Sequence, residues 1–162
     1  MPTSAVLDDL IDALEEQSDS LFSFLDRHTG EVFLISEESL ALTEADPETI
    51  AMLPDWQKEE ALRAVLIETT DRYLPLPDRF EVNEWNIMSE FCHEVKPDDV
   101  RAALLNAVQG NHAFRRFKEQ IAAHNLWEDW NRFRRQAFAE IIRDWSEEND
   151  ILLTARQAQT VR

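Results

Sequence analysis

Several features that define common classes of protein are missing from this chain of 162 residues. It contains one cysteine, which excludes a disulfide framework and a cysteine-rich metal site. Its two glycines are too few for the glycine-rich loops that bind nucleotide phosphates. No stretch approaches the about 18 consecutive apolar residues of a membrane-spanning helix, and the first residues lack the basic and apolar regions of a signal peptide. We therefore expect a cytoplasmic protein that has no cofactor and does not bind membranes.

Residue patterns that support catalysis or metal binding are also scarce. The four histidines show neither a His-x-x-x-His nor a His-Glu-x-x-His spacing, so no metal site is predicted. Cys92 falls on the apolar face of its predicted helix, which indicates a buried thiol and not a nucleophile. Adjacent acids such as Asp8 and Asp9 point in different directions on a helix and do not form a carboxylate pair. No catalytic residue is predicted, and the pattern favours a protein that is not an enzyme.

Basic residues are few in the first part of the chain. The whole chain carries 33 acidic and 16 basic residues, a net charge of −17. Residues 1–95 hold 23 of the acids and only 5 Lys or Arg, whereas residues 96–162 hold 10 acids and 11 Lys or Arg. Such a field repels nucleic acid from the first part of the chain. Nucleic-acid binding is therefore an option only for the basic segment in the C-terminal part.

Hydrophobic periodicity predicts an α+β fold that is mainly helical. Residues 4–17 read as an amphipathic helix with Ser4 as its N-cap. Two aromatic and β-branched runs around Gly30 predict an antiparallel β-hairpin over about 21–36. The alternating prolines of residues 73–77 exclude a helix there. They indicate either a third strand at the edge of the sheet or a connection between two lobes.

The second half of the chain is predicted to be a four-helix portion with a core rich in Trp and Phe. Its helices are expected at residues 84–95, 98–109, 113–124 and 126–148. Trp85, Phe114 and Trp127 are expected to face this core. We predict a single domain over residues 1–151, in which 1–72 and 78–151 are candidate lobes. Residues 152–162 have no clear apolar partner face and are expected to form a frayed tail.

Three motifs carry a resemblance to a known family. They are Thr29-Gly30-Glu31-Val32, Leu76-Pro77-Asp78-Arg79-Phe80 and, after Gly110, Ala113-Phe114-Arg115-Arg116-Phe117-Lys118. On these motifs the chain resembles a family of small, acidic bacterial proteins known only as an uncharacterised protein family. The resemblance covers about residues 4–151 and implies a coherent fold but no particular activity. His112 stands where the second glycine of a Gly-x-Gly is expected, so a ligand read through that glycine's backbone does not carry over.

One arginine falls inside the apolar arc of the last predicted helix. At about 100° per residue, Arg134 shares this arc with Trp130 and Phe138. An unpaired guanidinium there would cost several kcal/mol, so Arg134 pairs with a carboxylate, extends its charge to solvent or holds an anionic ligand. The candidate partners are Glu84, Glu90 and Asp78. An enzyme whose site is assembled around Arg134 is the third functional hypothesis.

The first functional hypothesis is an interaction or regulatory protein. It would use its acidic N-terminal surface to bind a protein partner or to form a homodimer. The alternative is a phosphate- or RNA-binding protein that uses the basic segment 115–135, because a helix start after Gly110 leaves backbone N–H groups for an anion. The basic side chains of this alternative are Arg115, Arg116, Lys118, Arg132 and Arg135.

Overall fold

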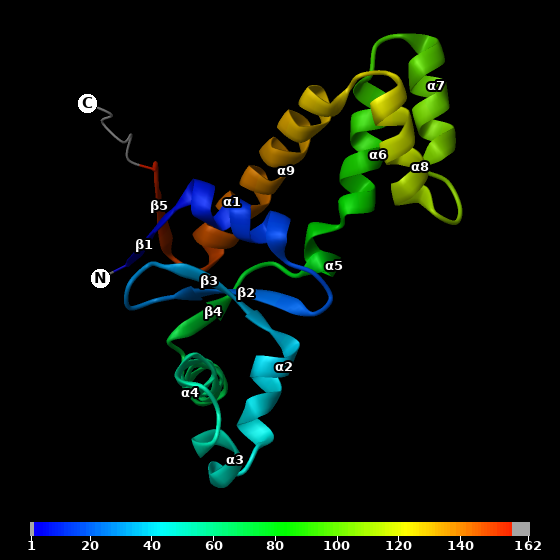
Figure 1. Ribbon diagram of the computed structural model, residues 1–162. Helices are drawn as coiled ribbons and strands as arrows, with labels where there is room; N and C mark the ends of the chain where they lie inside the picture. Colours follow the sequence, from blue (N-terminus) through cyan, green and yellow to red (C-terminus); the bar gives the residue numbers. More distant parts are fainter. Residues whose placement is uncertain (1, 157–162) are drawn as a thin grey trace, which may run out of the picture. The chain divides into compact units, whose positions relative to one another are not determined.

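The computed structural model describes residues 2–156, which form two compact units (Figure 1). The first unit contains the chain up to Arg79 and the chain from Ile142 onward, and the second contains Phe80–Ile141. The change of unit at Arg79 lies beside the predicted connection at residues 73–77. Residues 142–151, expected in a second lobe, belong to the first unit instead. A single folding domain over residues 1–151 stays a prediction.

A three-stranded antiparallel sheet forms the centre of the first unit. Strands β2 (Leu21–Asp26) and β3 (Val32–Ser36) are the predicted hairpin, and β4 (Tyr73–Pro75) pairs with the other side of β2. The strand order β3-β2-β4 places the proline-containing strand at an edge, where a missing N–H donor is tolerated. The mainly helical α+β class, the hairpin and the third strand are thus confirmed.

Helices cover both faces of this sheet (Figure 1). Helix α1 (Leu7–Glu16) lies on one face and buries the apolar stripe predicted for it. Helix α4 (Asp55–Thr69) lies on the other side, where the Arg63 guanidinium carbon stands 4.3 Å from the centre of the Phe33 ring. Between β3 and α4 the chain forms α2 (Glu37–Leu40), the 3₁₀ helix η1 (Ala41–Glu44) and α3 (Pro47–Ala51).

The N-terminal segment differs from the prediction. Thr3–Val6 is strand β1, which pairs in parallel with β5 (Ile151–Thr154), and the first helix begins only at Leu7. Ser4 is therefore a strand residue and not an N-cap. The expected frayed tail is also wrong at its start, because residues 152–154 belong to β5. Residues 157–162 of that predicted tail lie outside the described residues.

The turn of the hairpin is built on glycine for two reasons. Gly30 has a φ of +77°, a left-handed conformation that a Cβ disfavours. A Cβ on Gly30 would also stand 2.0 Å from the carbonyl oxygen of Ser4 in β1. The same residue thus permits the turn and lets β1 pass against it.

The second unit contains the predicted four-helix portion. Its helices follow the short α5 (Arg79–Val82) and are α6 (Glu84–Glu94), α7 (Asp98–Ala107), α8 (Ala113–Ala123) and the part of α9 (Trp127–Glu148) up to Ile141. Their core is aromatic, as predicted. The Phe117 and Trp130 rings are 4.8 Å apart between centroids, and Phe91 lies 5.4 Å from Trp130 and 6.2 Å from Phe117. Cys92 is buried in this unit, and its burial raises the pKa of the thiol to about 11.

Three aromatic residues expected in this core are half-exposed. Trp85 lies in the first turn of α6, Phe114 in the first turn of α8 and Trp127 in the first turn of α9, whereas Phe117 and Ile121 further along α8 are buried. The core covers only the middle of these helices, so the apolar stripe continues beyond it at the helix starts. Helical periodicity assigns a residue to a face of a helix, but it does not say how far along the helix the covering neighbours extend.

Candidate functional site

Helix α4 in the first unit presents large apolar side chains to solvent. Its exposed fractions are 60% for Trp56 and 61% for Leu62, whereas Ala64 is fully buried. Met52, just before the helix, and Val65 are exposed as well. At about 100° per residue, Trp56 lies on a different side of α4 from Leu62 and Val65. We call Leu62 and Val65 the α4 surface. Helix α4 therefore buries its alanines against the rest of the unit and leaves the larger apolar side chains of Leu62 and Val65 in contact with water.

The hydrophobic pattern of the sequence did not predict the α4 surface. Apolar residues occur at six of the seven positions from Ala61 to Ile67, so they surround the helix instead of forming one stripe. A helix that is apolar on more than one face has more than one neighbour to cover. That pattern was the available signal, but it does not say which side the protein's own sheet occupies.

An acidic groove lies on the face of the three-stranded sheet that α1 covers. It has a volume of about 340 Å³ and runs between α1 and the start of β3. Its carboxylates are Asp9, Asp12, Glu16 and Glu31. The Arg156 guanidinium, which follows β5, donates to Asp9 Oδ1 at 2.7 Å and to Asp12 Oδ2 at 2.9 Å. These two carboxylates raise the pKa of Arg156 by hydrogen bonding, so the acidic groove favours a cation.

Arg134 is an ion-paired residue in the second unit. Its Nε donates to Glu84 Oε1 at 2.9 Å and its Nη2 contacts the same oxygen, while its guanidinium carbon lies 4.6 Å from the centre of the Phe138 ring. Of the other candidate carboxylates, Glu90 accepts a hydrogen bond from Asn86 at 3.1 Å. The contact with Glu84 gives the guanidinium a counter-charge in an apolar arc, which supports a structural role.

The basic residues of α8 and α9 have contacts close to them in sequence. Arg115 pairs with Glu119 at 3.3 Å, and Arg132 pairs with Asp129 at 3.6 Å. The Arg116 guanidinium lies beside Gly110, 3.6 Å from where a Cβ on that residue would be. Of the two remaining residues of this set, Lys118 is exposed and Arg135 is half-buried.

Two of these arginines, Arg115 and Arg132, do not face each other. Phe117 on α8 faces Trp130 on α9, and their ring contact defines the sides on which the two helices meet. At about 100° per residue, Arg115 lies on the side of α8 opposite Phe117, and Arg132 lies on the side of α9 opposite Trp130. The two arginines therefore point away from the contact between their helices, and this arrangement does not support an anion held jointly by Arg115 and Arg132. A shared anion site of the five residues stays a prediction.

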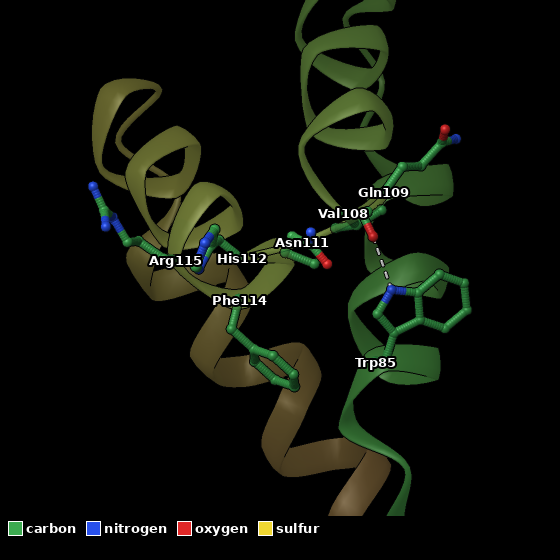
Figure 2. A pocket seen from close by; sticks show the side chains of 9 residues that line it. Trp85, Val108, Gln109, Asn111, His112, Phe114 and Arg115 are labelled. Carbon is green, nitrogen blue, oxygen red and sulfur yellow. Dashed lines mark hydrogen bonds between the residues drawn. The ribbon is translucent and has the colours of Figure 1, made fainter.

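The loop before α8 lines an open pocket of about 740 Å³ (Figure 2). Trp85 stands at one side of it, where its Nε1 donates to the Val108 carbonyl oxygen at 2.8 Å, and Phe114 stands at another. His112 in this loop has a φ of +62°, and it does not cap α8 with its side chain. Small-molecule sites enclose most of their ligand, which a pocket this open does not do.

Comparison with known proteins identifies the family. The model of the uncharacterised protein family UPF0158 matches residues 2–161. The chain belongs to this family. It is 31% identical over 160 residues to the UPF0158 protein PA5073 of Pseudomonas aeruginosa, an alignment that covers 98% of this chain and 92% of that protein. No solved structure matches the chain. The family resemblance of the sequence motifs is thus confirmed.

The left-handed backbone at position 112 explains why glycine is expected in the motif from which this UPF0158 chain departs with His112. Glycine is the residue that adopts a φ near +60° without a steric penalty, so a Gly-x-Gly at positions 110 and 112 suits the two positive φ values found there. Histidine occupies the second position in the same conformation. The glycine pattern of this loop therefore has a conformational reason, independent of any ligand.

Two further observations concern the chemistry available to this UPF0158 chain. Among residues 2–156, no three His, Cys, Asp or Glu side chains gather in a way that could hold a metal ion. Within the same described part, no helix is both long and apolar enough to cross a membrane. The surfaces with the most pronounced chemistry are the α4 surface and the acidic groove.

Proposed function

We propose that this UPF0158 protein is a cytoplasmic protein-binding protein that docks a partner on the α4 surface. The partner carries apolar side chains for Leu62 and Val65 and basic side chains for the surrounding carboxylates. The observation that supports this proposal is the inverted burial of α4, where Ala61 and Ala64 face the fold and larger residues face water. The single cysteine suits a reducing compartment.

The composition of the α4 surface suits a protein interface. A single exposed apolar residue is common and needs no explanation. Here, however, Leu62 and Val65 are three positions apart and therefore neighbours on one side of α4.

The charge around the α4 surface selects the kind of partner. Residues 37–71, which form α2, η1, α3 and α4, contain ten Asp or Glu but only two Lys or Arg. Two copies of this chain joined through the α4 surface would bring like charges together, which opposes a homodimer. A partner with a basic rim is attracted instead, and its association is faster at low salt.

The experiment uses two synthetic amphipathic helical peptides with the same stripe of leucines. One has lysines on its polar side and the other has glutamates. The full chain, labelled with ¹⁵N, is titrated with each peptide while its amide NMR signals are recorded. We expect the lysine peptide to shift the signals of α3 and α4, and Leu62→Glu to weaken its binding at least about tenfold, the loss that corresponds to about 1.4 kcal/mol. Phe80→Glu, which changes an exposed aromatic residue outside the α4 surface, is the matched control.

Three outcomes would contradict this proposal. Equal binding of both peptides would remove the electrostatic argument, and signals that shift elsewhere in the chain would remove the α4 surface as the site. A dimer in sedimentation that Leu62→Glu dissociates would assign the surface to a second copy. A single-stranded RNA oligonucleotide is tested in parallel. Salt-sensitive RNA binding that is lost on changing Arg115 and Arg132 would support the phosphate- or RNA-binding alternative instead.

A further inference from the structure

The acidic groove combines charge with a strand edge. Asp9, Asp12 and Glu16 line it from α1, and Glu31 lies where β3 begins. The other wall includes Val32–Leu34 of β3, which is an edge strand of the three-stranded sheet. An edge strand offers backbone N–H and C=O groups to another extended chain. The groove thus places carboxylates next to backbone groups that can pair with an incoming strand.

A guanidinium of the chain already bonds to two carboxylates of this groove. Arg156 comes from the C-terminal side of β5, far in sequence from α1, and bonds to Asp9 and Asp12 at 2.7 and 2.9 Å. Its side chain stays 53% exposed, so the groove does not enclose this arginine. Arginine can satisfy two carboxylates with its planar set of donors, which a lysine ammonium does less well. Arg156 therefore shows which chemical group these carboxylates accept.

Two carboxylates of the groove have no cationic partner in the described part of the chain when Arg156 is bound to Asp9 and Asp12. Within residues 2–156, neither Glu16 nor Glu31 forms an ion pair with a Lys or Arg. Both carboxylates are exposed, on the same groove as the Arg156 pair. A single guanidinium leaves these two charges unmatched. A ligand that matches all of them carries more than one cation.

We infer that the acidic groove is a binding site for an extended, arginine-containing segment of a partner protein, and that Arg156 competes with that segment for Asp9 and Asp12 in the free protein. The partner segment pairs its backbone with the edge of β3 and places its guanidinium groups against α1. It displaces Arg156 in doing so. This site is separate from the α4 surface, because α1 and α4 lie on opposite sides of the sheet (Figure 1).

The test measures binding of three short peptides to the full chain by calorimetry. The peptides alternate valine with arginine, valine with lysine, or valine with glutamate. We expect the arginine peptide to bind most tightly and the glutamate peptide not to bind. Arg156→Gln should strengthen binding of the arginine peptide about three- to tenfold, because the apparent affinity scales with the fraction of protein whose groove is free. The combined change Asp9→Asn and Asp12→Asn should weaken it at least about tenfold.

The matched control is Glu37→Gln with Glu38→Gln, which removes the same charge from exposed positions on α2, outside the groove. Thermal unfolding of each variant is recorded first, and if the Asp9 and Asp12 variant does not fold, the comparison with Arg156→Gln decides. The inference is overturned if Arg156→Gln does not strengthen binding, or if the control weakens binding as much as the groove variant does. Leu62→Glu should leave peptide binding intact, so failure of this inference and failure of the proposed function are distinguishable.

Discussion

His112 holds a φ of +62° although it carries a Cβ. A left-handed conformation costs an ordinary residue roughly 1–2 kcal/mol, and glycine avoids this cost but loses about 0.5–1 kcal/mol through its freer unfolded chain. We therefore predict that His112→Gly raises the free energy of unfolding by about 0.5–1 kcal/mol, measured by urea denaturation. His112→Ala removes the imidazole but keeps the Cβ. A gain of equal size in His112→Ala would show that the side chain, and not the backbone, is responsible.

Arg134 is the residue whose surroundings the sequence predicted in outline. Its position in an apolar arc left three options, a carboxylate pair, extension to solvent or an anionic ligand, and Glu84, with which it pairs, was one of three candidate carboxylates. Which carboxylate pairs with it depends on how α6 packs against α9, and the pattern of either helix alone does not contain that information.

The Arg134–Glu84 pair is partly buried, so its contribution should lie between those of exposed and fully buried pairs. We predict that Arg134→Met lowers the free energy of unfolding by about 1–2 kcal/mol. Glu84→Gln should cost less, since an amide oxygen still accepts from the guanidinium. A double-mutant cycle of the two changes measures their coupling. Additive effects would mean that the pair does not stabilise the second unit.

At the scale of elements, an ion pair ties the end of β2 to the segment before β4. The Asp26 side chain is 10% exposed and accepts from Arg72 Nε at 3.0 Å and from Arg72 Nη2 at 2.9 Å. The hydrogen bond from Arg72 lowers the pKa of Asp26 below its ordinary 3.8 against the opposing effect of burial, and the His28 N–H contributes in the same direction.

Because the pKa of Asp26 is lower in the folded state, its contribution to stability is complete above pH 3.8 and is lost as the pH falls through the lower folded value. We predict that Asp26→Asn destabilises the protein at about pH 6, and that its difference from the unchanged protein shrinks towards about pH 3. Urea denaturation across this range measures it, with exposed Asp71→Asn as control. A difference that does not vary with pH would contradict the ionic role of Asp26.

Substitutions on α4 test which side of this helix packs inside the protein and which side faces solvent. Ala64 is fully buried and Leu62 is exposed. We predict that Ala64→Leu lowers the free energy of unfolding by about 1–3 kcal/mol through overpacking. Leu62→Gln should change it by no more than about 0.5 kcal/mol, as at other exposed positions. Both are measured by chemical denaturation. If Leu62→Gln destabilises as much as Ala64→Leu, the α4 surface is covered within the protein itself.

Elements with strong end signals were predictable because those signals act within a few residues. Asp46 and Asn83 each accept a hydrogen bond from the backbone N–H three residues later, at 2.7 and 3.2 Å, and helices begin directly after them. Strand β1 has no such signal. It merges with the apolar stripe of α1 in the sequence, so the helix was predicted to begin three residues too early.

At the scale of the whole molecule, the first unit contains both ends of the described chain. Strand β5 pairs with β1 over its full length, and Ile151 and Ala5 are buried there. We predict that ending the chain after Asp150 lowers the free energy of unfolding by at least about 2 kcal/mol, since burial of one isoleucine contributes about 1.5–3 kcal/mol. Ending it after Thr154 keeps β5 and is the control. Equal thermal stability of the two truncated chains would show that β5 does not support the first unit.

The sequence alone was sufficient for the mainly helical α+β class, the hairpin around Gly30, the four helices of the second unit and the family. Periodicity, caps and turn residues are local, and they act over a few residues wherever the segment lies. Only the tertiary structure revealed three features. They are the pairing of β1 with β5, the bonds of Arg156 to α1 and the exposed side of α4. Each depends on contacts between residues far apart in sequence, and the free energy of such contacts depends on which surfaces the fold brings together.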